Sequence, residues 1–199
     1  MVINYGGKWA KGIVFTASLV PFAWLAYAVL TDRAGANPVE FATHGTGEWA
    51  LRFLLFSLAI TPLRKLISLP DLIKFRKMLG LYAFFYATVH FLIWLILDKS
   101  FDLAGMLADT VKRPFITAGM AALVVMIPLA ITSTTGWIRR LGKRWRILHR
   151  LVYFSAVAAV VHFYWLVKSD VREPLFYAAL LGVLFLFRLP YMANLRLIR

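Results

Sequence analysis

Four histidines are the side chains in this sequence that best suit a cofactor site: His44, His90, His149 and His162. A neutral imidazole binds a transition metal through either ring nitrogen. The chain contains no cysteine, which excludes disulfides, thiolate nucleophiles, iron–sulfur clusters and cysteine-bound zinc. It also contains no HExxH, GxGxxG, Walker or GxSxG motif, so zinc protease, NAD, ATP and acyl-transfer chemistry have no support.

The elements that must position these histidines are membrane spans. Of the 199 residues, 61% are hydrophobic and only 16% are charged, whereas soluble domains are about 45–50% apolar and about 25% charged. Because a spanning helix needs about 20 mostly apolar residues, the charge-free runs predict an all-α, polytopic membrane protein with a bundle of six transmembrane helices. The predicted spans are Ile13–Leu30, Phe53–Leu63 (extended toward Trp49 past a snorkelling Arg52), Met78–Leu97, Pro114–Ile138, Leu151–Val167 and Pro174–Phe187.

The basic residues divide by side of the membrane. With the N-terminus placed in the cytoplasm, the inner segments carry 16 Lys and Arg against one acid, Asp71, and the outer segments carry seven against eight acids. This is the positive-inside pattern of short loops. The net charge of +14 therefore indicates orientation and contact with membrane lipid. We predict that both termini are cytoplasmic and that there is no nucleic-acid partner.

His90 and His162 are predicted to share one depth in the bilayer on two different helices. Both helices run outward, and both histidines lie toward the outer ends. A single ionisable residue at this depth could be a hydrogen-bonded packing residue, but such residues are costly in a membrane and usually functional. Two imidazoles at one depth suit a haem held between helices by two axial ligands, which is a six-coordinate site for electron transfer.

His149 marks a second level near the inner face, 13 residues before His162, or about 20 Å along a helix. The corresponding position on the third helix is Arg76, which shares a helix face with His90. Arginine has no free lone pair for iron, but its guanidinium can pair with a haem propionate; the alternative is a charge that only sets topology. Because 13 residues of ideal helix leave His149 and His162 about 140° apart, a two-haem arrangement requires His149 to lie in a non-helical entry or beside a bulge.

His44 is expected in the first outer loop, beside Gly45 and Gly47. It is either an ordinary loop residue or a contact with a partner or a quinone at the outer face. Zinc would need three or four close ligands, and a di-iron site would need carboxylates inside helices, so neither fits. No internal repeat is evident.

Short motifs along the chain carry a family resemblance. They are Leu58–Arg64 (LAITPLR), Arg76–Tyr82 (RKMLGLY), Tyr86–His90 (YATVH), Thr132–Thr134 (TST), Leu141–His149 (LGKRWRILH) with Tyr153, and His162. Together they resemble the haem-binding membrane subunit of the bacterial periplasmic methionine sulfoxide reductase system, the MsrQ (formerly YedZ) family. The resemblance covers nearly the whole chain, including its length and its number of spans.

This resemblance implies a single ferric-reductase-like transmembrane haem-binding domain over residues 1–199, related to the membrane part of NADPH oxidases. By motif match, His90, His149 and His162 would be haem ligands. The larger ferric reductase pattern has two histidines on each of two helices, and here Arg76 stands in place of the fourth. The family carries b-type haem, so one or two haems are expected, and bound FMN has also been associated with it.

The resemblance also implies partners and a location. Members of the family lie in the bacterial inner membrane and pass electrons outward, from a quinol or a cytosolic flavin reductase, to a periplasmic molybdopterin enzyme. That partner reduces methionine sulfoxide in oxidised proteins, so catalysis is expected there and the present chain would have no catalytic residue. The basic loop Arg139–Arg150 is mainly topological but could also dock an acidic flavin donor.

Two other functions stay open at this point. A membrane transporter would use Pro21, Pro62 and Pro128 to break helices, but no transmembrane acid or broken-helix pair with substrate contacts is evident. A non-catalytic assembly protein would leave the intramembrane histidines unexplained. The sequence therefore favours electron transfer through haem.

Overall fold

The computed structural model describes residues 7–167 and 169–188, and the regular structure in these residues is entirely helical. The longer helices are α1 (Lys8–Leu30), α2 (Pro38–Leu66), α3 (Ile73–Ile93), α5 (Pro114–Ile131), α8 (Leu151–Leu166) and α9 (Arg172–Leu186). The shorter elements are the 3-10 turn η1 (Pro70–Leu72), the π-helix η2 (Trp94–Asp98), α4 (Leu103–Lys112), α6 (Thr135–Leu141) and α7 (Lys143–Leu148). The predicted all-α class is confirmed.

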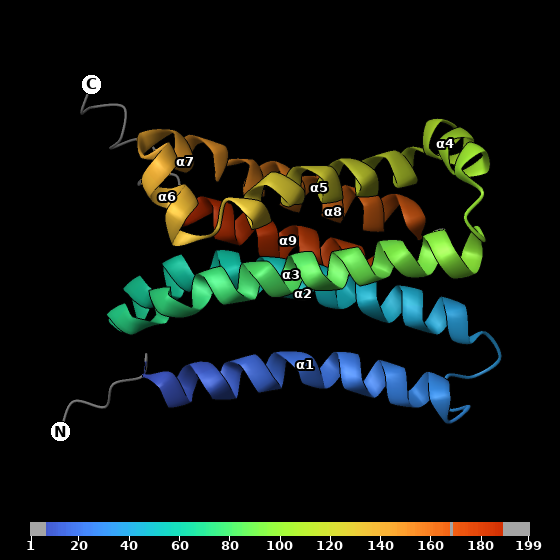
Figure 1. The fold of residues 1–199 in the computed structure, drawn as a ribbon, viewed down its shortest axis with the longest axis horizontal. Helices are drawn as coiled ribbons and strands as arrows, with labels where there is room; N and C mark the ends of the chain where they lie inside the picture. Colours follow the sequence, from blue (N-terminus) through green and yellow to red (C-terminus); the bar gives the residue numbers. More distant parts are fainter. Residues whose placement is uncertain (1–6, 168, 189–199) are drawn as a thin grey trace.

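The long helices lie side by side in one bundle (Figure 1). Helix α1 runs along one edge, α2 and α3 lie next to it, and α5 and α8 lie at the opposite edge. The most extensive packing joins α2 to α3 and α5 to α8, so the bundle contains two closely packed helix pairs. Helices α6 and α7 lie together at one end of the bundle, and α4 lies at the other.

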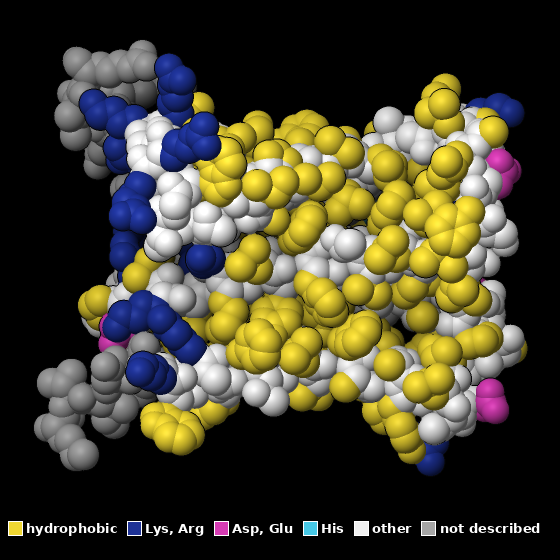
Figure 2. Space-filling view, viewed as in Figure 1, with side chains coloured by type: hydrophobic (Ala, Val, Ile, Leu, Met, Phe, Trp, Pro, Cys, Tyr) yellow, Lys and Arg dark blue, Asp and Glu magenta, His cyan; other side chains and the backbone are white. Residues whose placement is uncertain are grey.

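The surface of the bundle separates charge from apolar side chains. Lys and Arg side chains gather at the end that carries α6 and α7, whereas Asp and Glu appear mostly at the end that carries α4 (Figure 2). Between the two ends the visible face is largely hydrophobic. An apolar band this wide is unusual on a soluble monomer and suits lipid contact, so we call the basic end inner and the acidic end outer.

Four helices are long and apolar enough to cross a membrane: Lys8–Leu30, Pro70–Asp98, Pro114–Ile131 and Lys143–Leu166. A multi-pass membrane protein is thereby confirmed. The predicted second and sixth spans lie within α2, which carries Glu48 and Arg52, and α9, which has only 15 residues. The count of six spans and the side of the termini stay predictions.

Helix α2 begins earlier than predicted. Its first turn starts at Pro38, and the Asn37 side chain accepts a hydrogen bond of 3.1 Å from the Glu40 backbone N–H. An asparagine cap followed by proline at the first helical position is a strong start signal. The prediction that His44 lies in a loop is therefore wrong, because His44 lies in the second turn of α2.

Helix α5 ends earlier than predicted. The predicted span reached Ile138, but α5 ends at Ile131 and a separate helix, α6, begins at Thr135. The Thr132 and Ser133 hydroxyls donate to the carbonyls of Pro128 and Leu129 in the last turn. Hydroxyl groups that bond the backbone in this way compete with helix continuation, and they explain the break.

Tyrosines of α3 fix α1 to the bundle next to Pro21. The fully buried Tyr86 hydroxyl accepts a hydrogen bond from the Phe22 N–H (2.9 Å) and donates one to the Ser18 carbonyl (2.8 Å). It thereby bridges two backbone groups that would bond each other directly in an uninterrupted helix. The Tyr86 ring also stacks on Phe53 of α2, with ring centres 5.2 Å apart. This contact joins three helices below the candidate site.

Candidate functional site

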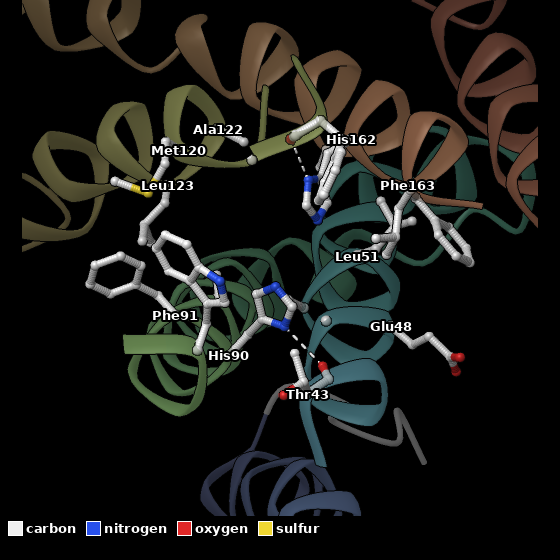
Figure 3. Close-up of a pocket in the computed structure, with 18 of the residues that line it drawn as sticks. Thr43, Glu48, Leu51, His90, Phe91, Met120, Ala122, Leu123, His162 and Phe163 are labelled. Atoms are coloured by element: carbon white, nitrogen blue, oxygen red, sulfur yellow. Dashed lines mark hydrogen bonds between the residues drawn. The ribbon is translucent and has the colours of Figure 1, made fainter. Parts of the chain in front are cut away.

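His90 and His162 face each other across the bundle, although 72 residues separate them in the sequence. His90 lies near the end of α3 and His162 lies in α8. Their ring centres are 6.1 Å apart and the rings are nearly perpendicular, at 81°. Figure 3 shows one nitrogen of each ring directed toward the opposite ring. The structure therefore brings together the two histidines that the sequence placed at one depth.

Each of these histidines is oriented by a backbone carbonyl on the neighbouring helix. His90 Nδ1 lies 2.8 Å from the Thr43 carbonyl oxygen, and His162 Nδ1 lies 2.6 Å from the Phe115 carbonyl oxygen. A carbonyl can only accept, so each Nδ1 carries the proton and donates it. This tautomer leaves Nε2 of both rings with a free lone pair. A histidine that binds a metal through one ring nitrogen usually donates the N–H of its other ring nitrogen to a carbonyl or carboxylate, which fixes the orientation of the ring.

Two glycines make room for the rings. A Cβ atom at Gly47 in α2 would lie 3.0 Å from His90 Nδ1, and one at Gly119 in α5 would lie 2.8 Å from His162 Nδ1. Any side chain at these positions would have to displace the imidazole or the helix. Each glycine lies four residues after the residue whose carbonyl accepts the histidine proton, one helical turn further along.

These contacts reveal an internal repeat. The histidine and its carbonyl acceptor are 47 residues apart in both helix pairs, α2–α3 and α5–α8. The prediction that the chain lacks a repeat is therefore wrong. Its sequence signal is short: LAIT occurs at residues 58–61 and again at 129–132, and AxVHF occurs at residues 87–91 and 159–163. Both motifs are short enough to escape notice in an apolar chain.

A cavity of about 230 Å³ lies beside the two rings, and its walls are mainly apolar. Helices α2, α3, α5 and α8 all contribute to it. Figure 3 shows Leu51, Phe91, Met120, Leu123 and Phe163 around the histidines. A metal held at about 2 Å by one nitrogen of each ring would need ring centres at about the observed separation. The facing lone pairs and the apolar walls therefore fit a flat, mostly apolar metal macrocycle.

At the inner level, His149 lies in the turn that joins α7 to α8. His149 ends α7, and with Arg150 it separates α7 from α8. The regular helix that carries His162 begins only at Leu151, so His149 lies in the entry to that helix. Its ring stacks on Trp145 at 4.0 Å between ring centres, and its Nε2 lies 3.0 Å from the Thr132 hydroxyl.

The tautomer of His149 differs from that of the outer pair. The Thr132 hydroxyl lies 2.6 Å from the Pro128 carbonyl and donates its proton there. It can therefore only accept from His149, so Nε2 carries the proton and Nδ1 has the free lone pair. The Trp145 indole N–H donates to the Thr132 carbonyl at 2.9 Å and holds the same junction.

Arg76 lies close to the position that the repeat makes equivalent to His149, 73 residues before it where His90 and His162 are 72 apart. Its Nη1 is 3.4 Å from the Thr61 hydroxyl, and Thr61 and Thr132 are the last residues of the two LAIT segments. Arg76 is within electrostatic range of His149. The structure thus brings Arg76 and His149 to one level.

His44 lies in α2 one turn before Glu48, and both residues line the cavity beside His90. They also line a second groove between α1 and α2, together with Trp24, Phe41 and Trp49. His44 is solvent-exposed and does not join the facing pair of rings. Among residues 7–167 and 169–188, no group of three or more His, Cys, Asp or Glu could hold a metal ion.

The comparisons with known proteins agree with this geometry. Residues 46–160 match the family described as ferric reductase like transmembrane component. The chain is 52% identical to the protein-methionine-sulfoxide reductase heme-binding subunit MsrQ of Herminiimonas arsenicoxydans, over 89% of this chain and 83% of that protein. The protein of the same name from Ralstonia nicotianae is 53% identical over 86% and 80%, and that from Xanthomonas oryzae pv. oryzae is 51% identical over 88% and 83%. No solved structure matches the chain.

Proposed function

The chain belongs to the MsrQ family of the ferric-reductase-like membrane components, and on this basis we propose that it is a membrane subunit that binds b-type haem and transfers electrons. Its relatives carry the name of heme-binding subunits of protein-methionine-sulfoxide reductase. The single observation that carries the proposal is the facing pair His90 and His162, each with Nδ1 bonded to a carbonyl and with Nε2 free.

At the outer level, His90 and His162 would hold the haem iron through Nε2. The haem, when bound, supplies a one-electron carrier whose oxidation state changes without transfer of atoms. The chain's own residues set the conditions. The Thr43 and Phe115 carbonyls hold the imidazoles in the metal-binding tautomer and make Nε2 a stronger donor. The apolar walls keep water from the site, and a dry environment strengthens every electrostatic influence on the carrier.

At the inner level, His149 would supply a ligand for a second haem. Arg76 would pair with a propionate, because its guanidinium donates hydrogen bonds to a carboxylate and offers no lone pair to iron. The number of haems in the proposal is therefore one or two. Two carriers stacked along the bundle would connect the inner face to the outer face.

The charge of the two ends supports the orientation in the membrane, and electron transfer toward the outer face is part of the proposal. We propose six spans with cytoplasmic termini in the bacterial inner membrane, which places α6 and α7 at the cytoplasmic face. Their arginines, which include Arg139, Arg140 and Arg146, would dock an acidic flavin donor, or a quinol would donate from the membrane. FMN is a candidate bound cofactor of the same route.

At the outer end the proposed acceptor is a periplasmic molybdopterin subunit that reduces methionine sulfoxide for the repair of oxidised proteins. His44 and Glu48 line both the cavity and the outer groove, so His44 is a candidate contact for that partner or for a quinone. Reduction of the substrate would occur in the partner.

Reduced-minus-oxidised spectra of the full chain, purified after expression with added haem precursor, test the proposal. We expect the sharp bands of low-spin b-type haem and, by haem extraction, one or two haems per chain. A protein that is folded by circular dichroism but colourless, although haem was supplied in excess, would overturn it.

A further inference from the structure

Two guanidinium groups lie near each other at the inner end of the bundle, on elements that are distant in the sequence. Arg76 is in α3, and Arg188 follows the end of α9. Arg188 is only 6% exposed, although it is charged at any physiological pH. Arg76 is partly buried, and the two groups are within electrostatic range of each other. Two like charges placed together in this way require an explanation.

Part of the environment of Arg188 is structural. Its Nη2 donates to the Leu58 carbonyl in α2, and its Nη1 lies 2.5 Å from the Tyr153 hydroxyl. The Leu58 carbonyl would normally accept from the residue four positions later, but that residue is Pro62, which has no N–H. Arg188 therefore satisfies a carbonyl that the proline leaves unpaired. A neutral amide side chain could do the same, so this contact does not account for the charge.

The third guanidinium nitrogen of Arg188, Nε, has no hydrogen-bond partner among the described residues. This nitrogen is buried. A buried donor without a partner is costly, and more so on a charged group. An unpartnered donor on a nine-tenths buried arginine indicates that a group is missing from the site.

The protein supplies no side-chain carboxylate to neutralise the pair. All nine Asp and Glu lie in the described residues, and the ion pairs that those residues form involve neither Arg76 nor Arg188. The acid nearest the inner end, Asp71, pairs with Lys74. Buried charges are normally paired, because an unpaired one is strongly destabilising. No Asp or Glu side chain in residues 7–167 and 169–188 supplies the missing counter-ion, so an anionic group of a ligand is the candidate.

We propose that Arg76 and Arg188, with the Tyr153 hydroxyl, form an anion-binding site for a carboxylate or phosphate group of a bound ligand. Tyr153 lies within interaction range of both guanidiniums, and Arg188 also lies over its ring at 5.1 Å. Planar guanidiniums bind carboxylate and phosphate oxygens in matched pairs of hydrogen bonds. Where the anion is a haem propionate, this inference rests on the proposed function; a phosphate group would bind independently of haem.

The test compares anionic and neutralised probes on the full chain in lipid nanodiscs. Haem-depleted protein is titrated with haem and with haem dimethyl ester, which lacks the propionate charges, and separately with inorganic phosphate observed by phosphorus NMR. The variants are Arg188→Gln and Arg188→Lys, and Lys11→Gln is the matched control because Lys11 is an exposed base at the inner end of α1.

If the bound anion is a haem propionate, the wild type should bind haem roughly 10- to 100-fold more tightly than the ester. This ratio corresponds to the free energy of one or two charge-assisted hydrogen bonds. The difference should disappear in Arg188→Gln, persist in Lys11→Gln and be partly kept in Arg188→Lys. If the bound anion is a phosphate, the wild type should bind haem and the ester with equal affinity. The phosphorus NMR line of inorganic phosphate should then broaden with the wild type and not with Arg188→Gln.

Equal affinity for haem and ester in the wild type, together with no phosphate binding, would overturn the anion site. If Arg188→Gln does not fold, Arg76→Gln is measured with the same probes, because its side chain is partly exposed. A wild type that binds no haem but binds phosphate through Arg188 would contradict the proposed function and leave the anion site supported.

Discussion

At both the outer and the inner level of the bundle, each half of the internal repeat contributes one side chain, and the two levels differ in chemistry. At the outer level both positions hold histidine, and both rings donate Nδ1–H to a carbonyl and pack on a glycine. At the inner level one position holds His149 and the other Arg76, and each contacts the threonine of a LAIT segment. The repeat therefore provides the positions, and the residue type decides whether a position can bind a metal or an anion.

The largest expected effect is the loss of haem from the outer level when one of its two histidines is replaced. His90→Ala or His162→Ala should abolish the outer haem, because one of the two imidazoles that would hold the iron is lost. Haem content and low-spin absorbance should fall by at least half in a two-haem protein and to near zero in a one-haem protein.

His149→Ala is the control for that experiment. It should leave the outer haem spectrum unchanged and remove only an inner haem. Unchanged haem content in both His90→Ala and His162→Ala would refute the outer assignment. A complete loss in His149→Ala would instead mean that the two levels are not independent.

The second effect tests the glycines that only the outer level has. Gly119→Ala should weaken haem binding by roughly 10- to 100-fold, the usual effect of a change next to a metal ligand, because the new methyl group would displace His162. Gly47→Ala should act in the same direction and more weakly, since its Cβ would lie slightly farther from the ring.

Gly182→Ala in α9 is the matched control, because a Cβ there would meet no atom within 4 Å. Its haem affinity, measured by titration of haem-depleted protein, should equal that of the wild type. If Gly119→Ala also binds haem normally, the rings can adjust, and the glycines are not required for the site.

The third effect concerns the inner level alone. Thr132→Val removes the acceptor that holds His149 Nε2–H and should weaken an inner haem about tenfold while the outer spectrum stays constant. Redox titration that resolves the two haems would measure this. Stronger inner binding in the variant would mean that the Thr132 bond competes with ligation through Nε2.

The smallest effect is a pH response confined to the outer end. The hydrogen bond from Lys99 holds the pKa of the partly buried Asp109 carboxyl below its usual value. A carboxyl with a lowered folded-state pKa stabilises the fold above its usual pKa, and that stabilisation is lost as the pH falls through the folded value. The protection of α4 amides from exchange, relative to the intrinsic rate at each pH, should therefore fall below about pH 4.

Asp109→Asn should remove this acid response of α4 and leave the inner helices α6 and α7 unaffected. Hydrogen-exchange mass spectrometry of the two ends in one sample makes the comparison internal. Equal acid sensitivity of α4 in wild type and variant would show that the Lys99–Asp109 pair does not secure this helix.

Several features could be predicted from the sequence because their signals are local. The apolar runs gave the helical membrane class, and the placement of His90 and His162 gave their common depth. The start of α2 could also have been predicted, since Asn37 and Pro38 form a cap signal ahead of the apolar run. Its polar first half, which contains His44 and Glu48, lacks the uncharged run that is typical of a membrane span.

Other parts of the site carry no local signal. Nothing around Thr43 or Phe115 indicates that its carbonyl orients a histidine 47 residues later, because a backbone acceptor is independent of the side chain. The roles of Gly47 and Gly119 likewise depend on which ring lies opposite. The pairing of Arg188 with Leu58 arises only because Pro62 frees a carbonyl at the point where the end of α9 approaches α2.

An all-helical membrane protein with a basic and an acidic end, and with histidines at two depths, can be predicted from the sequence of this chain alone. Hydropathy, charge and helical rise are properties of single segments, so they can be read without a fold. The tertiary structure decided which residues meet: two histidines with free Nε2 atoms at one level, and His149 with Arg76 at the other. Those contacts depend on the packing of α2 with α3 and of α5 with α8, which only the folded chain specifies.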